Sequence, residues 1–169
     1  MTRRLIVLRH AKAEAHDRVD FGRELTDRGS RDAAAFGEHL AARGWLPDHA
    51  YVSAATRTRQ TWAAVQQASG STATVGYERS LYDYGVDEAL DLLRLAPEDA
   101  ETVILVGHNP TVAYLAHELC DEGSDPEALA KLRQGYPTCA GATFVADCPW
   151  ADLAPGRATL VDLTVGRHN

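Results

Sequence analysis

The sequence has few lysines, few cysteines and no long hydrophobic segment, and each of these absences excludes a class of protein. Its 169 residues include only two lysines, Lys12 and Lys131, and acidic residues outnumber basic ones by 24 to 17. The resulting net charge of −7 argues against non-specific binding to nucleic acid or to an anionic membrane surface, because both attract cationic proteins. The three cysteines form no CxxC pair and no disulfide framework, which favours a reducing cytoplasm.

Hydrophobic runs are short throughout the chain. The apolar run at residues 5–8 follows two arginines, but it is far shorter than the hydrophobic region of a signal peptide. No other run approaches the length of a membrane span. We therefore expect a cytoplasmic protein that does not enter a membrane. The chain length suits a single domain over residues 1–169, with enough residues to bury a core.

Predicted strands alternate with predicted helices along most of the chain, which indicates an α/β fold. Continuous apolar runs at 5–8 and 102–106 are typical of strands buried on both faces of a sheet. Such alternation predicts βαβ units, and hence a three-layer α/β/α sandwich with a mainly parallel central sheet. We expect strands at 5–8, 50–53, 74–77, 102–106, 142–146 and 158–164, and helices between Thr26 and Gly44 and at 56–68, 87–95, 109–120 (Asn109 as cap, Pro110 in first position) and 126–133.

Basic and imidazole side chains follow three of the predicted strands. Arg9 and His10 come directly after the first strand, Arg57 lies just beyond the second, and His108 follows the fourth. The carboxyl ends of parallel strands are where ligands bind in such sheets. These residues therefore predict a cationic pocket in an acidic protein, and its preferred ligand is a phosphoryl group. A histidine there can attack phosphorus as a covalent nucleophile.

Four segments around these residues resemble, in order, the motifs of the histidine phosphatase superfamily, which has the phosphoglycerate-mutase-like fold. Leu8-Arg9-His10-Ala11 resembles its signature, and Leu25-Thr26-Asp27-Arg28-Gly29 resembles its LTxxG segment. Residues 53–61 match SxxxRxxQT, and Val106-Gly107-His108-Asn109 resembles the segment of the second histidine. The short chain, the RHAKA form and the segment Arg23-Glu24-Leu25-Thr26 are most similar to the SixA-type phosphohistidine phosphatases.

The resemblance implies a role for each matching residue. His10 would be the nucleophile that becomes phosphorylated, Arg9 and Arg57 would hold the phosphoryl oxygens, and His108 would stabilise the group in transfer. Arg23 matches an arginine of this branch that lines the pocket, although a solvated position in the loop explains it equally well. The reaction would be two in-line displacements through phosphorylated His10, with water completing the cycle. The resemblance implies no cofactor and no metal ion.

One part of the family pattern is missing. Larger members have a glutamate that acts as general acid, whereas residues 78–88 lack a clear acid motif and offer Asp83 as the best substitute. Asp83 also fits a turn residue before Gly85. An alkoxide leaving group needs protonation, since the comparable hydroxyl of water has a pKa of about 15.7. Imidazole, whose cation has a pKa of about 6.5, leaves more readily. The missing acid motif therefore favours a phosphohistidine substrate.

The hypothesis is therefore a bacterial, metal-independent phosphohistidine phosphatase. Its partner would be a protein bearing phosphohistidine or a small phosphorylated molecule, bound in an open cleft. Two alternatives stay open: a phosphatase of small phosphate esters on the same fold, and a catalytically weak module that binds phosphate. The other five histidines show no HExxH or HxH spacing, which argues against a metal enzyme. Residues after Cys120 carry no motif of recognisable chemistry.

Overall fold

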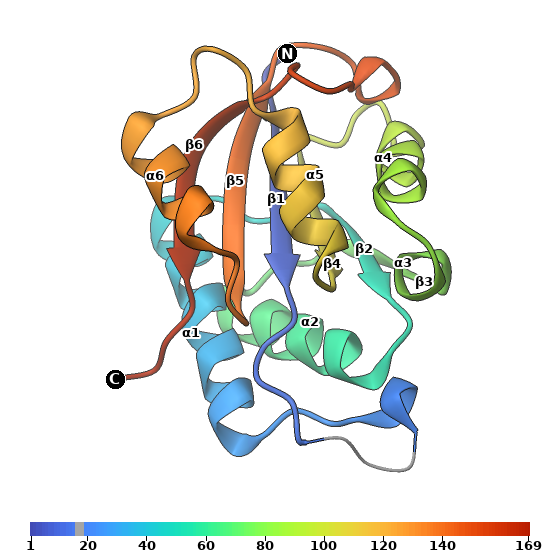
Figure 1. The fold of residues 1–169 in the computed structure, drawn as a ribbon, viewed down its shortest axis with the longest axis vertical. Coiled ribbons are helices and arrows are strands. Elements are labelled where there is room, and N and C mark those ends of the chain that lie inside the picture. The colour runs from blue at the N-terminus through green and yellow to red at the C-terminus, as the bar shows by residue number, and fades with distance from the viewer. Residues whose placement is uncertain (16–18) are drawn as a thin grey trace.

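A six-stranded sheet organises the computed structural model, which describes residues 1–15 and 19–169 (Figure 1). The spatial order of the strands is β3-β2-β4-β1-β5-β6. The strands are β1 (Arg3–Arg9), β2 (His49–Ser53), β3 (Thr74–Glu78), β4 (Thr102–Gly107), β5 (Ala140–Ala146) and β6 (Thr159–Val165). The α-helices are α1 (Asp27–Arg43), α2 (Thr56–Ser69), α3 (Ser80–Asp83), α4 (Val86–Arg94), α5 (Thr111–Leu119) and α6 (Pro126–Gln134); 3-10 turns occupy η1 (Asp20–Gly22) and η2 (Trp150–Asp152).

The sheet is parallel on one side and antiparallel on the other. Strand β4 pairs in parallel with β1 and β2, and β2 pairs in parallel with β3. Strand β5 runs antiparallel to both β1 and β6. The expected α/β architecture with a mainly parallel sheet is confirmed. All six predicted strands form, and they differ from the predicted ranges by one or two residues at their ends.

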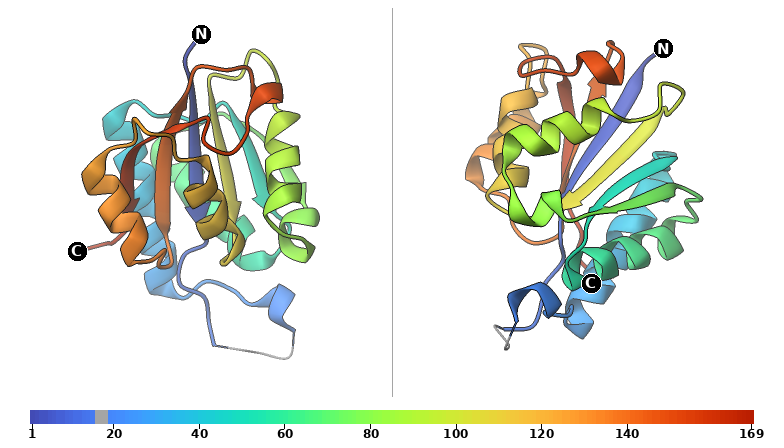
Figure 2. Two further views of the ribbon diagram at one scale, coloured as in Figure 1. Left: turned by 45° about the horizontal axis from the view of Figure 1, so that its top comes forward. Right: turned by 90° about the vertical axis from the view of Figure 1, so that its right-hand side faces the viewer.

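Alternate side chains of the central strands enter two separate hydrophobic cores. In β1, Leu5 and Val7 pack with α4, α5 and α6, whereas Ile6 and Leu8 pack with α1 and α2. All four are fully buried. Figures 1 and 2 show the same arrangement, with helices on both faces of the sheet. This burial on both faces explains why the residues of β1 from Leu5 to Leu8 are all apolar.

Most helix boundaries follow the predicted capping signals. Thr26 is the N-cap of α1 and accepts a hydrogen bond from the amide of Gly29 at 2.9 Å, and Gly44 ends the helix in the left-handed region at φ 67°. The predicted start of α5 is wrong by one residue, since the N-cap is Pro110 and the first helical residue is Thr111. The Asn109 amide Nδ2 donates instead to the Tyr136 carbonyl at 2.8 Å, so this side chain is not a cap. The short helix α3 was not predicted, because four residues are too few to show a helical period.

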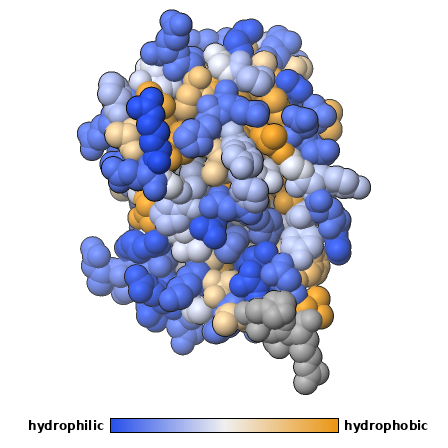
Figure 3. Space-filling view, viewed as in Figure 1, coloured by the Kyte–Doolittle hydropathy of each residue, from blue (hydrophilic) through white to orange (hydrophobic). Residues whose placement is uncertain are grey.

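Within residues 1–15 and 19–169, no helix is long and apolar enough to cross a membrane. Hydrophilic residues predominate on the face shown in Figure 3, and the hydrophobic residues visible there form small, separate areas.

Close backbone contact fixes the loop after β1 against the start of α1. The Lys12 carbonyl accepts a hydrogen bond from the amide of Thr26 at 2.9 Å. A Cβ atom at Gly29 would lie only 2.0 Å from that same carbonyl oxygen. This contact explains the glycine of the LTxxG segment, because no larger residue fits without moving the loop that follows Arg9 and His10.

We expect Gly29→Ala to destabilise the protein, because the added methyl group would displace the Lys12 carbonyl. The expected loss is about 1–3 kcal/mol of unfolding free energy, measured by urea denaturation. Gly22→Ala is the matched control, since a Cβ atom there meets nothing within 4 Å. Equal stability of the two variants would contradict this account of the loop.

Candidate active site

The predicted strand-end residues meet at one edge of the sheet. Strand β1 ends at Arg9 and β4 ends at Gly107, and these two residues are register partners. His10 and His108 follow directly, and their ring centroids lie 5.4 Å apart. The His10 amide donates to the Gly107 carbonyl at 3.0 Å, which continues the parallel pairing past the strand ends.

His10 is held as a neutral ring with one nitrogen occupied. Its Nδ1 lies 2.7 Å from the Ala11 carbonyl oxygen, and only 7% of the residue is exposed. A carbonyl can only accept, so Nδ1 carries the proton and Nε2 keeps its lone pair. Burial, together with the positive charges of Arg57 and Arg9, lowers the pKa of His10 from 6.5 to about 4. The ring is therefore neutral at physiological pH.

His108 is positioned by the end of β2. Its Nε2 lies 2.7 Å from the Ser53 hydroxyl, which also accepts a hydrogen bond from the Ala55 amide at 3.4 Å. The hydroxyl hydrogen of Ser53 is thus free to donate to Nε2, which would leave the proton of the ring on Nδ1. Nδ1 is buried and has no hydrogen-bond partner in the described part of the chain. Burial, followed by the charge of Arg57, lowers the pKa of His108 to about 3.

Two guanidinium groups flank the histidines, that of Arg57 buried and that of Arg9 half-buried. Arg57 lies in the first turn of α2 and is 5% exposed, and its Nη1 donates to the backbone carbonyl of Asp20 at 2.9 Å. The Nη1 of Arg9 donates to the Tyr136 carbonyl at 3.0 Å. Burial, and then the charge of Arg57, lower the pKa of Arg9, so the two cations oppose each other in this pocket. Such a pair favours an anionic ligand between them.

The segment 53–61 uses its polar residues to hold these parts together. Ser53 contacts His108, and Arg57 reaches the pocket from the next turn. Thr61 accepts a hydrogen bond from the Ala11 amide at 3.0 Å, which fixes the residue after His10. Gln60 accepts one from the Leu25 amide at 2.8 Å, which ties down the LTxxG segment. The polar residues of segment 53–61 therefore contact the loop after β1, the LTxxG segment and the loop after β4.

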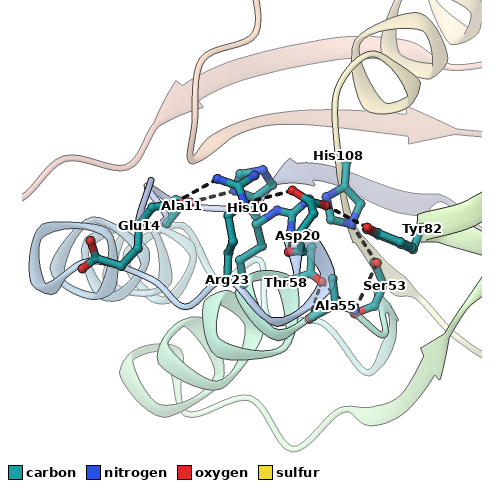
Figure 4. A network of polar contacts seen from close by, with 11 residues as sticks. His10, Ala11, Glu14, Asp20, Arg23, Ser53, Ala55, Thr58, Tyr82 and His108 are labelled. Atoms are coloured by element: carbon teal, nitrogen blue, oxygen red, sulfur yellow. Dashed lines mark hydrogen bonds and ion pairs between the residues drawn. The ribbon is translucent and has the colours of Figure 1, made fainter. Parts of the chain in front are cut away.

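An acidic residue also lies in the pocket, at the end nearest α3. Asp20 pairs with Arg23 through Oδ1 at 2.9 Å and with Arg57 through Oδ2 at 3.2 Å. The Tyr82 hydroxyl donates to Oδ2 at 2.8 Å. This hydrogen bond, with the charges of Arg57 and Arg23, lowers the pKa of Asp20 to about 2. Figure 4 shows the carboxylate between Arg23 and Tyr82, beside both histidines.

Comparison with known proteins agrees with this geometry. A family model described as "Histidine phosphatase superfamily (branch 1)" matches residues 5–90, about half of the chain. The chain belongs to the histidine phosphatase superfamily. It is 33% identical to Rv1276c of Mycobacterium tuberculosis, a protein without an assigned function, over 95% of this chain and 100% of that one.

Solved structures place this histidine phosphatase in the SixA-type branch. A Nakamurella multipartita protein provisionally assigned as the phosphohistidine phosphatase SixA is 38% identical, with a TM-score of 0.85 over 98% of this chain and 97% of that one. An Agrobacterium tumefaciens protein with the same provisional assignment is 29% identical, with a TM-score of 0.80 over 96% and 97%. The expected phosphoglycerate-mutase-like fold is thereby confirmed.

The predicted site residues of this histidine phosphatase fall into two groups. His10, Arg9, Arg57 and His108 lie together, and Arg23 joins them through Asp20 rather than lying free in solvent. Asp83 lies on α3 and pairs with Arg79 at 3.1 Å; in the described residues it makes no hydrogen bond or ion pair with the other five. Its role as general acid stays a prediction.

Two residues of the pocket were missed by sequence reasoning. Asp20 lies in an irregular polar loop, where an acidic residue is ordinarily solvated. Tyr82 lies within residues 78–88, where the family pattern predicts a carboxyl group and not a phenol. The available signal was the segment Arg23-Glu24-Leu25-Thr26, which predicts a role for Arg23. Asp20 precedes Arg23 by three residues and forms a hydrogen bond with it. No group of three or more His, Cys, Asp or Glu side chains in the described chain is arranged to hold a metal ion.

Both histidines are expected to titrate far below the ordinary value of 6.5, at about 4 for His10 and about 3 for His108. The unfolded chain binds protons between pH 6.5 and these values while the folded chain does not, so stability falls as the pH falls through this window. Titration of ring ¹⁵N shifts by NMR, with His10→Asn and His108→Asn to assign the signals, measures both pKa values. A midpoint near 6.5 for either ring would contradict the buried cationic pocket.

Proposed function

We propose that this histidine phosphatase is a phosphohistidine phosphatase whose nucleophile is Nε2 of His10. The observation that carries the proposal is the state of that ring: Nδ1 is bound to the Ala11 carbonyl at 2.7 Å, and the pKa is lowered to about 4. A neutral imidazole with its free lone pair in a pocket of two guanidinium groups is suited to attack a phosphoryl group. The similarity to SixA-type proteins supports the same assignment.

The reaction would take place in two displacements. In the first, the Nε2 lone pair forms a bond to phosphorus, and the bond from phosphorus to the leaving group breaks and leaves its electron pair there. Arg9 and Arg57 would neutralise the phosphoryl oxygens, and Nδ1–H of His108 would donate to one of them. In the second, a water oxygen attacks phosphorus in line, Nε2 recovers its lone pair, and phosphate leaves with the proton from water.

A phosphohistidine substrate suits this pocket because its leaving group needs little help from an acid. The described residues place no protonated carboxyl group beside the two histidines, since Asp20 is ionised with a pKa of about 2. Imidazole departs as a neutral molecule when its second nitrogen carries a proton, whereas an alkoxide must be protonated as it leaves. We propose a phosphohistidine-bearing protein as the substrate, with phosphate esters as the alternative.

Parallel kinetics on the two kinds of substrate test this proposal. We expect kcat/KM for a phosphohistidine-bearing protein to exceed that for a panel of alkyl phosphates, because imidazole is the better leaving group. Release of inorganic phosphate without added metal gives both rates. Faster turnover of one alkyl phosphate than of the phosphohistidine protein would favour the ester phosphatase instead.

His10→Ala should lower turnover of either substrate by at least about 10⁴-fold, because it removes the nucleophile. The matched control is His117→Gln. His117 is exposed on α5, and within the described residues its side chain forms no hydrogen bond with the pocket residues. Unfolding curves that coincide with the unmodified protein would show that His10→Ala is folded. Retained turnover in a folded His10→Ala preparation would refute the nucleophile assignment.

A further inference from the structure

The proposed reaction gives no role to the carboxylate of Asp20, which lies in the pocket beside Arg57. A site that binds a phosphoryl group gains nothing from a negative charge, because the carboxylate repels the phosphoryl oxygens and competes for Arg57. Asp20 nevertheless contacts Arg57 twice, through its backbone carbonyl at 2.9 Å and through Oδ2 at 3.2 Å. The position of this carboxylate in the pocket is therefore explained by a role other than phosphoryl binding.

The Asp20 carboxylate has unused capacity to accept a hydrogen bond. Within the described part of the chain, its two oxygens receive three side-chain donors, namely Arg23 at Oδ1 and Arg57 and Tyr82 at Oδ2. A carboxylate has about four acceptor positions, so Oδ1 can accept one more donor. The side chain is also 40% exposed, in contrast to 6% for Arg57, so a ligand can reach it.

Aromatic side chains lie beside this carboxylate. Tyr82 packs edge-on against His108, with ring centroids 5.6 Å apart. Phe21, the next residue after Asp20, also packs edge-on against Tyr82, with ring centroids 4.9 Å apart. A flat heteroaromatic group that enters between the phosphoryl site and this rim would meet apolar ring surface and one anionic acceptor. This combination matches imidazole better than a sugar or an alkyl chain.

We infer that Asp20 binds the leaving group and selects for phosphorus–nitrogen over phosphorus–oxygen bonds, an inference that rests on the proposed phosphohistidine phosphatase activity. The imidazole of a phosphohistidine carries phosphorus on one nitrogen and, when protonated, a hydrogen on the other. Asp20 accepts a charge-assisted hydrogen bond from that N–H. The phosphorus–nitrogen bond then breaks, its electron pair returns to the imidazolium ring, and a neutral imidazole leaves with its N–H intact.

The same carboxylate opposes ester substrates. When a phosphorus–oxygen bond breaks without protonation, the leaving oxygen becomes negative, and a fixed carboxylate beside it raises the barrier by repulsion. Asp20 thus acts in opposite directions on the two substrate classes. A residue that merely positioned Arg57 would affect both classes alike, so the ratio of their rates separates the two roles.

The test compares Asp20→Asn with the unmodified protein on N-phosphorylimidazole and on p-nitrophenyl phosphate, whose leaving group departs as an anion. We expect the ratio of kcat/KM for the nitrogen-linked over the oxygen-linked substrate to fall by about 10-fold to 100-fold in Asp20→Asn. Glu24→Gln is the matched control, because it removes the same charge from an exposed residue of the same segment. That variant should leave the ratio unchanged.

Each outcome distinguishes this inference from the proposed function. If Asp20→Asn lowers both rates equally, with the ratio unchanged, Asp20 only positions Arg57 and the inference is overturned, while the proposed function stands. If the unmodified protein hydrolyses the ester but neither N-phosphorylimidazole nor a phosphohistidine protein, the proposed function itself is overturned. Thermal unfolding of each variant establishes that the comparison is made on folded protein.

Discussion

Parallel pairing of β1, β4 and β2 is the constraint on which the pocket depends. It brings three strand ends to one edge, and with them two imidazole rings whose centroids lie 5.4 Å apart. Arg57 is buried beside the rings and Arg9 is half-buried, so their charges are only partly screened by water. The pocket consequently disfavours protonated histidine and favours an anion. The same electrostatic condition keeps the proposed nucleophile, His10, neutral and would attract a phosphorylated substrate.

The whole-chain charge and the pocket charge have opposite signs, and the two have separate consequences. A net charge of −7 opposes association with polyanions over the whole surface. Inside the pocket, arginine suits the proposed phosphoryl ligand, because a guanidinium group can bind two phosphoryl oxygens and remains charged when buried. Asp20 is the exception within the pocket, where the hydrogen bond from Tyr82, together with the charges of Arg57 and Arg23, lowers its pKa.

Features set by short-range patterns could be predicted from the sequence. The strand ends, the cap at Thr26 and the stop at Gly44 follow from apolar runs and capping residues, and the four pocket residues follow from their places after strands. Long-range contacts could not be predicted in this way. Asp20 meets Tyr82 across 62 residues of chain, and no local pattern encodes that contact. Similarly, the Tyr136 carbonyl that receives Arg9 is supplied by a segment with no recognisable motif.

The most direct test of this account is to trap the phosphorylated enzyme. Rapid mixing with a phosphohistidine-bearing protein, followed by an alkaline quench that preserves phosphorus–nitrogen bonds and by peptide mass spectrometry, identifies the phosphorylated residue. The account predicts phosphate on His10 alone, formed and lost within the time of one turnover, and none in His10→Ala. Phosphate on another residue, or turnover with no phosphorylated enzyme at any time, would contradict it.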